Sequence, residues 1–384
     1  MFSRRLNWEA SPNPISRLLE EKRRAGARVL DLTESNPTRA GLSYPEEAIL
    51  GALADPASLR YEPNPRGLAS ARAAVSRYYE ERGIAVAPSQ ILLTASSSEA
   101  YAYLFKLLAD PGGEVLIPRP SYPLFEFLAR LESVNVRQYS LRYDGAWHID
   151  FDSLEKAIEE RTRAIVAVSP NNPTGSFVKI EEAERLHDIA ERHDLAIISD
   201  EVFSDYGFAA DANRTPTLLA PNRALTFCLS GLSKIAGLPQ MKIGWIAAGG
   251  TCHDIALQRM EWIADTYLSV GTPIQAALPR ILAASEEVRA QIRRRTAANL
   301  ALLREFTRGS TAGVLNVEGG WYTILRIPRI HSEEQWVMRL LRGSDVLTQP
   351  GFFYDFESEA FLVLSLLTEP AIFSEGLRRI LSQF

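Results

Sequence analysis

The sequence predicts an α/β protein whose central part forms a mainly parallel sheet of seven strands. Seven short apolar runs rich in β-branched residues recur between residues 90 and 250, and segments with helical spacing of apolar residues separate several of them. Strands and helices that alternate in this way form a parallel sheet covered by helices. The predicted strands are Ile91–Thr94, Val115–Ile117, Asn135–Tyr139, Ala164–Ser169, Leu195–Ser199, Leu225–Leu229 and Ile243–Ala247. The clearest predicted helices are Glu99–Ala109 and Ile180–Arg192.

Length and composition bound the class of protein. A chain of 384 residues indicates two domains, or one large domain with a smaller partner. Hydrophobic residues make up 46% of it and charged residues 23%, which allows a sizeable core, and the net charge of -5 gives no basic surface for nucleic acid. Two cysteines, Cys228 and Cys252, fit a reducing compartment. The first residues hold no apolar signal core and no run approaches the ~20 residues of a membrane span, so we expect a cytoplasmic protein.

Shorter elements precede the sheet. An amphipathic segment, Ile15–Ala27, is followed by a small strand, Val29–Leu32, and by the loop sequence ESNPTRAG. In that loop Asn36 precedes a proline, which breaks regular structure and turns the chain. Tyr61 lies in a proline-rich loop that ends at Gly67, and an amphipathic helix is predicted after it.

Polar side chains follow the ends of several predicted strands. After the first strand, Ser96, Ser97 and Ser98 open a helix, where free N–H groups and hydroxyls suit a phosphate, although a serine N-cap is the simpler alternative. Tyr122 follows the second strand and can stack on a flat heterocycle or merely pack. Asn172 follows the fourth strand and offers an amide donor.

A carboxylate and a lysine follow the next two strands. Asp200 ends an apolar strand, where an unpaired carboxylate is costly, so we expect a cationic partner. Lys234 follows the sixth apolar run and can form a Schiff base with an aldehyde when its amine is desolvated, although a lone Ser-Lys pair is weak evidence. Because ligands bind outside the carboxyl ends of parallel strands, all these side chains are expected to meet at one edge of the sheet.

These motifs together resemble the class I/II aminotransferases, a family of fold type I pyridoxal-phosphate enzymes. The resemblance rests on the NPTG sequence Asn172–Gly175, the Asp200–Glu201 pair and Ser233–Lys234, in the family's order and spacing. The segment Val346–Phe353, VLTQPGFF, is similar to a family turn that closes the small domain on the site. The resemblance covers nearly the whole chain.

The resemblance implies a domain arrangement and an assembly. It implies a large three-layer αβα domain of roughly residues 41–275 and a small α+β domain built from residues 1–40 and 276–384. It also implies a homodimer with shared active sites, in which Tyr61 reaches the cofactor phosphate of the partner subunit.

The resemblance further implies roles for the site residues, with pyridoxal 5'-phosphate as cofactor. Lys234 would carry the cofactor and move the α-proton of the substrate, Asp200 would keep the pyridine nitrogen protonated, Asn172 would bond the phenolic oxygen and Tyr122 would stack on the ring. The remaining cofactor-binding residues are implied to be Ser96, Ser97, Ser98, Ser233, Lys242 and Tyr61. The substrate-binding residues are expected to be Ser35, Asn36 and Arg326.

The sequence departs from the family pattern at several site positions. Phe203 stands where a tyrosine is common, Lys242 where an arginine binds the phosphate, and Gly231 where a serine is common. In the last strand, Val363 stands where an arginine usually binds the substrate carboxylate, by the register of Ser365. Arg326 and Arg39 are the candidate substitutes for that arginine, and Tyr206 is a candidate substitute for the missing tyrosine.

The function that these features predict is transfer of an amino group from an amino acid to a 2-oxo acid by a ping-pong, Schiff-base mechanism. A lyase, racemase or decarboxylase that uses the same Lys234 and Asp200 is an alternative, and a non-catalytic cofactor-binding protein is another. The histidines are scattered without metal-ligand spacing, so no metal site is predicted. The sequence does not identify the amino donor or the acceptor.

Overall fold

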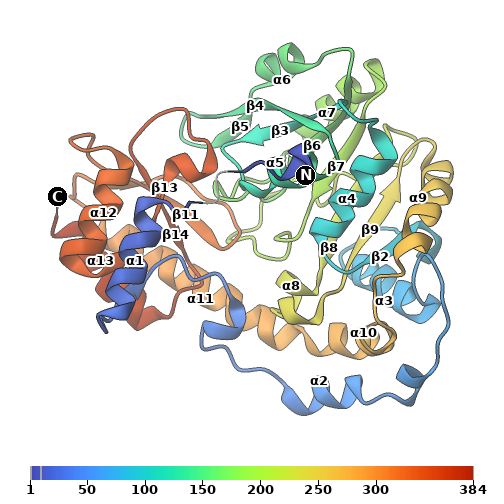
Figure 1. Ribbon diagram of the computed structural model, residues 1–384, viewed down its shortest axis with the longest axis horizontal. Coiled ribbons are helices and arrows are strands. Elements are labelled where there is room, and N and C mark those ends of the chain that lie inside the picture. The colour runs from blue at the N-terminus through green and yellow to red at the C-terminus, as the bar shows by residue number, and fades with distance from the viewer. Residues whose placement is uncertain (1, 9–10, 384) are drawn as a thin grey trace.

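A computed structural model describes residues 2–8 and 11–383 (Figure 1). Its main feature is an eight-stranded sheet with the order β2-β9-β8-β7-β6-β3-β4-β5. The strands are β2 (Ile91–Thr94), β3 (Glu114–Arg119), β4 (Asn135–Tyr143), β5 (Trp147–Ile149), β6 (Thr162–Val168), β7 (Ala196–Asp200), β8 (Thr226–Gly231) and β9 (Gly244–Gly249). Neighbours from β4 to β8 pair in parallel, whereas β9 runs antiparallel to both β2 and β8.

The predicted α/β class is confirmed, and each of the seven predicted strands overlaps a strand of this sheet. The sheet has one strand more than predicted, because β5 pairs antiparallel with the end of β4. A run of three residues is too short to display the alternation by which a strand is recognised in a sequence. The helix predicted at Ile180–Arg192 has those bounds, and the helix predicted at Glu99–Ala109 is found two residues earlier at its start.

Helices cover both faces of the sheet. They are α2 (Glu46–Leu53), α3 (Ala69–Glu80), α4 (Ser97–Leu108), α5 (Leu124–Leu131), α6 (Phe151–Ala157), α7 (Ile180–Arg192), α8 (Leu232–Ile235), α9 (His253–Tyr267) and α10 (Thr272–Ala284). Successive residues of a strand point to opposite faces, so Ile197 packs in a core with α3, α7 and α10, whereas Ile198 packs in another core with α4, α5 and α9. The large domain therefore has three layers.

A smaller body lies beside the large domain (Figure 1). Its helices are α1 (Pro14–Arg24), α11 (Glu286–Phe306), α12 (Glu333–Ser344) and α13 (Pro370–Leu381), and its strands are β1 (Leu30–Asp31), β10 (Gly313–Val314), β11 (Tyr322–Arg326), β12 (Val346–Leu347), β13 (Gln349–Pro350) and β14 (Phe361–Ser365). One sheet has the order β10-β11-β14-β13, and β1 pairs in parallel with β12. Both chain ends thus meet in one core, which contains Ile15, Leu32, Trp336 and Phe373.

Two segments depart from the expected domain bounds. Residue 275 falls inside α10, and the apolar residues of this helix on both sides of it are buried in the core of the large domain: Ile274, Ala277, Leu278, Ile281 and Leu282. Residues 4–8 lie against the large domain, because Arg5 donates to the carbonyl of Leu131 and Trp8 packs edge-on against Phe127. Short 3-10 turns connect the elements: η1 (Arg4–Leu6), η2 (Pro37–Arg39), η3 (Pro56–Leu59), η4 (Pro88–Gln90), η5 (Pro239–Met241) and η6 (Gly351–Tyr354).

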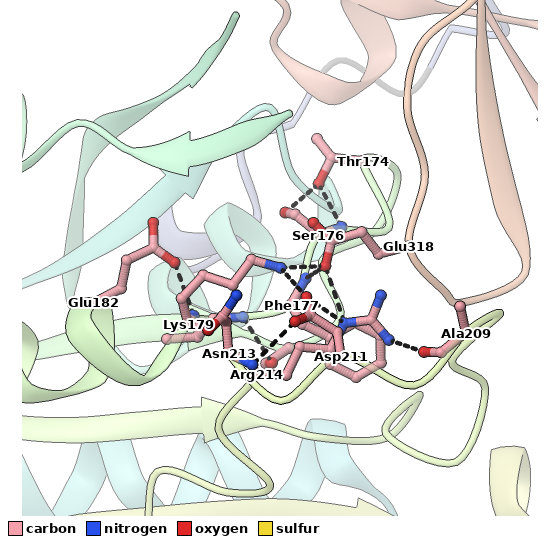
Figure 2. A network of polar contacts seen from close by, with 12 residues as sticks. Thr174, Ser176, Phe177, Lys179, Glu182, Ala209, Asp211, Asn213, Arg214 and Glu318 are labelled. Atoms are coloured by element: carbon pink, nitrogen blue, oxygen red, sulfur yellow. Dashed lines mark hydrogen bonds and ion pairs between the residues drawn. The ribbon is translucent and has the colours of Figure 1, made fainter. Parts of the chain in front are cut away.

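A polar network joins the two domains (Figure 2). Glu318, between β10 and β11, forms ion pairs with Lys179 and with Arg214, at 3.2 Å for the latter, and both cations come from the large domain. The carbonyl of Gly175 accepts hydrogen bonds from the N–H groups of Glu318 and Gly319, at 3.2 and 3.0 Å. The joint therefore fixes the small domain next to the loop that carries Asn172.

Candidate active site

The predicted site residues converge on a cavity of about 410 Å³ at the carboxyl ends of the parallel strands. Val168 ends β6, Asp200 ends β7 and Gly231 ends β8, and all three line the cavity. Residues from the small domain close its other side. The predicted residues that line this cavity are Ser35, Ser96, Ser97, Ser98, Tyr122, Asn172, Asp200, Ser233, Lys234 and Lys242.

Lys234 is held by its backbone and surrounded by aromatic rings. It lies on the one-turn helix α8, and the hydroxyl of Tyr206 donates to its carbonyl oxygen at 2.5 Å. Its Nζ lies 5.2 Å from the ring centre of Phe203 and 4.8 Å from that of Trp321. Burial lowers the pKa of Lys234 from 10.5 to about 8, and the nearby carboxylate of Asp200 opposes this shift. A lysine with a lowered pKa provides a neutral, nucleophilic amine near neutral pH.

Asp200 is oriented by two hydrogen bonds. The hydroxyl of Tyr101 donates to Oδ2 at 3.1 Å, and the N–H of Val202 donates to Oδ1 at 3.2 Å. Burial raises the pKa of Asp200, and these two donors together with Lys234 oppose the rise. Within the described residues no ion pair reaches Asp200, so the expected cationic partner is present only as the more distant charge of Lys234. A cation bound against this carboxylate would stabilise its charged form.

The start of α4 lines the cavity. Ser96 is the N-cap of this twelve-residue helix, because its Oγ accepts from the N–H of Glu99 at 3.1 Å. The simpler prediction of a serine N-cap is therefore confirmed for Ser96, while Ser97 and Ser98 line the cavity in the first turn. Lys242 adds a positive charge at the same cavity. First-turn N–H groups, hydroxyls and a lysine form a site suited to a phosphate.

Within residues 2–8 and 11–383, two buried polar atoms next to the cavity have no hydrogen-bond partner. They are Oδ1 of Asn172 and Oγ of Ser230, and both residues line the cavity. Buried polar atoms are almost always hydrogen-bonded, so these two atoms indicate a polar ligand or water at this place. The partly exposed ring of Tyr122 also lines the cavity. A flat, phosphorylated heterocycle fits this set of residues.

The small domain supplies an uncharged side of the cavity. Tyr322 begins β11, Gln349 begins β13, Tyr354 ends η6, and all three line the cavity with Ser35. The hydroxyl of Tyr354 donates to Oε1 of Gln349, and Ser35 lies next to the hydroxyl of Tyr322. Val363 pairs directly with Gln349 in the sheet and is buried among apolar residues.

Three predicted site residues do not line the cavity. The side chain of Asn36 accepts from the N–H of Thr38 and caps η2. Arg326 is exposed at the far end of β11, four residues beyond Tyr322, and Tyr61 lies on a loop where 77% of it is exposed. The candidate substitutes also lie elsewhere, because Arg39 is exposed and the hydroxyl of Tyr206 bonds the backbone of Lys234.

Sequence reasoning missed several residues of the site. Tyr101, which bonds Asp200, is one of many apolar-spaced residues of a helix, and no sequence signal separates it from core tyrosines. The strand WYTILR was singled out for Arg326, but it enters the site at Tyr322. Gln349 reaches Tyr322 through β14, which lies between their strands, so no local pattern links the two.

A second cavity, of about 340 Å³, has charged residues that are already paired. Arg82 forms an ion pair with Asp205 at 2.8 Å, and Arg214 forms one with Glu318. The carboxylate of Glu201 accepts hydrogen bonds from the N–H of Leu218 and the hydroxyl of Ser199. The charged side chains named here are therefore paired within the protein and do not require a bound ligand.

Among residues 2–8 and 11–383, no group of three or more potential ligands could hold a metal ion, and no helix has the length and hydrophobicity needed to cross a membrane. The candidate site is thus a cavity lined by Lys234, by Asp200 and by the N-terminus of α4. The fold and this site define an α/β protein with a lysine and an aspartate in a cavity at the carboxyl ends of its parallel strands, and comparisons with known proteins identify the family.

The family model described as aminotransferase class I and II matches residues 27–370. Glutamate-pyruvate aminotransferase AlaA of Haemophilus influenzae is 28% identical over 91% of this chain and 88% of its own length. Mouse tyrosine aminotransferase is 28% identical over 63% of this chain and 56% of its own length. The structure of alanine aminotransferase from Pyrococcus furiosus superposes with a TM-score of 0.90 at 22% identity, covering 100% of this chain and 99% of that one.

The chain belongs to the class I and II aminotransferase family. It is therefore an enzyme that transfers amino groups, and the predicted family and activity are confirmed.

Proposed function

We propose that this aminotransferase binds pyridoxal 5'-phosphate in the cavity around Lys234 and moves an amino group from an amino acid to a 2-oxo acid. When bound, the cofactor supplies an aldehyde that condenses with amines and a ring that accepts electrons from the substrate. The observation that carries the proposal is the meeting of Lys234, Asp200 and the N-terminus of α4 around one cavity. The unpartnered Oδ1 of Asn172 supports it, since a buried acceptor beside the cavity indicates a ligand or water that donates a hydrogen bond there.

The residues of the chain then have distinct tasks. The amine of Lys234, with its pKa lowered to about 8, attaches the cofactor and takes the proton from the α-carbon of the substrate. Asp200 holds a proton on the pyridine nitrogen, and Tyr101 and Val202 orient its two oxygens. Tyr122 stacks on the ring. The phosphate is bound by Ser96, Ser97, Ser98, Ser233 and Lys242.

Replacement of Lys234 tests this assignment. The variant Lys234→Ala is expected to lose transaminase turnover by about 10³-fold or more, because it removes both the attachment point and the proton carrier. Initial rates are measured with glutamate and alanine as donors and with their 2-oxo acids as acceptors. Full turnover by Lys234→Ala would overturn the assignment, whereas Lys156→Ala, on the exposed surface outside the cavity, serves as a matched lysine control.

We further propose a homodimer in the cytoplasm. Tyr61 lies on an exposed loop and lines a shallow cavity with Leu268, and Trp262 on α9 is 75% exposed. Exposed apolar side chains such as these support a protein interface. In the dimer, Tyr61 would reach the phosphate of the partner subunit. The free thiols of Cys228 and Cys252 fit a reducing compartment.

A further inference from the structure

The uncharged side of the cavity points to the kind of group that the substrate carries on its α-carbon. Four polar side chains lie there: Ser35, Tyr322, Gln349 and Tyr354. Burial raises the pKa of Tyr322 to about 12 and raises the pKa of Tyr354 well above its usual value, so both hydroxyls stay neutral near pH 7. Since Tyr354 donates to Oε1 of Gln349, the amide nitrogen of Gln349 remains available as a donor.

No guanidinium or imidazole lines this cavity within the described residues, and Lys234 and Lys242 are its lining cations. Both lysines come from the large domain and serve the cofactor in the proposed function. Asp200 and a cofactor phosphate of about -1.5 to -2 charges offset them, so a substrate carboxylate would enter a cavity without excess positive charge. Removing a carboxylate from water costs several kcal/mol of free energy, on the order of that for a buried ion, unless a cation pairs with it.

The strand pairing shows which side chain lies beside Gln349 on this side of the cavity. Val363 lies directly opposite Gln349 in the antiparallel pair of β13 and β14, and directly opposite Ile324 of β11. Residues opposite each other in a sheet point to the same face, so Val363 occupies the position beside Gln349. It is buried with Ile324 and Tyr354. An apolar contact therefore stands next to the donors.

We propose that Ser35, Tyr322, Gln349 and Tyr354 hold the α-substituent of the substrate through uncharged hydrogen bonds, so that the enzyme accepts amino donors bearing a carboxamide or alcohol there about as well as free amino acids. This inference rests on the proposed aminotransferase function. Uncharged hydroxyl and amide groups bond a carbonyl or hydroxyl as readily as they bond a carboxylate, whereas a guanidinium favours the carboxylate by a charge-assisted, two-pronged contact. An amide donor becomes a 2-oxo amide, and its amino group and α-hydrogen are exchanged for the acceptor's oxygen, so no external oxidant is needed.

Matched donors test the inference on the enzyme loaded with pyridoxal phosphate. Alanine is compared with alaninamide, and phenylalanine with phenylalaninamide and phenylalaninol. Dissociation constants come from the change in cofactor absorbance and kcat/KM from product formation, both corrected for the fraction of free amine. Mass spectrometry of the 2-oxo amide excludes prior hydrolysis of the amide. The expected result is a kcat/KM within tenfold of that of the parent amino acid.

Two variants sharpen the comparison. Gln349→Arg places a guanidinium in the cavity and is expected to raise the preference for the carboxylate over the amide at least tenfold. Tyr322→Phe removes one hydroxyl and is expected to weaken binding of both members of a pair by similar factors. Arg329→Gln, on the exposed surface, is the control. If Gln349→Arg does not fold, the donor pairs still decide the question with the unmodified enzyme.

The outcomes separate the two proposals. A preference of more than tenfold for the amino acid in the unmodified enzyme would overturn the inference and indicate a cation from the partner subunit. In that case the aminotransferase function stands. If no amine, charged or uncharged, changes the absorbance of the bound cofactor, the proposed function fails and the inference fails with it.

Discussion

Asp200 is a carboxylate whose position favours its function over the stability of the empty protein. Burial raises its pKa, and the hydrogen bonds from Tyr101 and Val202 recover only part of the cost. A protonated pyridine nitrogen bound against it would reverse this effect, because an opposite charge favours the charged carboxylate. Strained or desolvated groups are common at functional sites for this reason.

The substitution Asp200→Asn separates these two effects. Turnover should fall about 10²- to 10³-fold, the range for loss of one electrostatic stabiliser. The raised pKa means that stability of the cofactor-free protein falls as pH rises through the folded-state pKa. Asp200→Asn should therefore unfold at a higher temperature than the unmodified protein at pH 7, and the difference should shrink as the pH falls through the folded-state pKa and the carboxyl becomes protonated. A lower unfolding temperature at pH 7 would contradict this account.

At the scale of elements, α4 both builds the large domain and presents the anion site. Its buried face includes Tyr101 and Leu104, and its N-cap is Ser96. The small-domain helix α12 has an equivalent serine cap, since Oγ of Ser332 accepts from the N–H of Gln335 at 3.2 Å. The two helices thus offer matched caps, one next to the cavity and one outside it.

Removal of each cap distinguishes stability from binding. Ser96→Ala and Ser332→Ala should each lower the free energy of unfolding by about 1 kcal/mol. Ser96→Ala alone should also weaken the binding of pyridoxal phosphate while leaving the binding of unphosphorylated pyridoxal unchanged. Chemical denaturation and absorbance titrations measure the two quantities. Equal effects of both variants on cofactor binding would show that the start of α4 is not the phosphate site.

Elements formed by residues that are neighbours in the sequence could be predicted, whereas clusters of residues that are distant in the sequence could not. The strands of the large sheet were found because each is a short apolar run, and Asp200 and Lys234 were found because they directly follow such runs. The cluster of Tyr322, Gln349 and Tyr354 was missed, because its members meet only after three strands pair. The exposed position of Arg326 and the local cap formed by Asn36 were likewise seen only in the structure.

At the scale of the whole molecule, the polar network around Glu318 joins the two domains. It thereby holds Tyr322, Gln349 and Tyr354 of the small domain at the cavity that contains Lys234. Glu318 is partly buried and pairs with Lys179 and Arg214 (Figure 2). The carbonyl of Gly175 accepts hydrogen bonds from the backbone N–H groups of Glu318 and Gly319. Loss of its charge would leave Lys179 and Arg214 with Asp211 as their remaining anion, at 3.5 and 3.6 Å. A partly buried ion pair broken on one side is destabilising.

Glu318→Gln should therefore lower the free energy of unfolding by about 1–3 kcal/mol. The matched control is Glu375→Gln, because Glu375 pairs with Arg378 and Arg379 on an exposed face of α13 and should matter by less than ~1 kcal/mol. Both are measured by denaturant unfolding of the cofactor-free protein. If the two substitutions have equal effects, the polar joint does not stabilise the assembly of the two domains.

The central claim is that Lys234 and its neighbours carry a two-stage transfer of an amino group. The most direct test follows the visible absorbance of the protein loaded with pyridoxal phosphate during sequential additions. An amino donor should bleach the band with release of one equivalent of 2-oxo product per site, and a 2-oxo acid should restore it with formation of one equivalent of amino product. A band that shifts with donor but never depends on an acceptor, with continuous release of product, would contradict aminotransfer and indicate a lyase or decarboxylase instead.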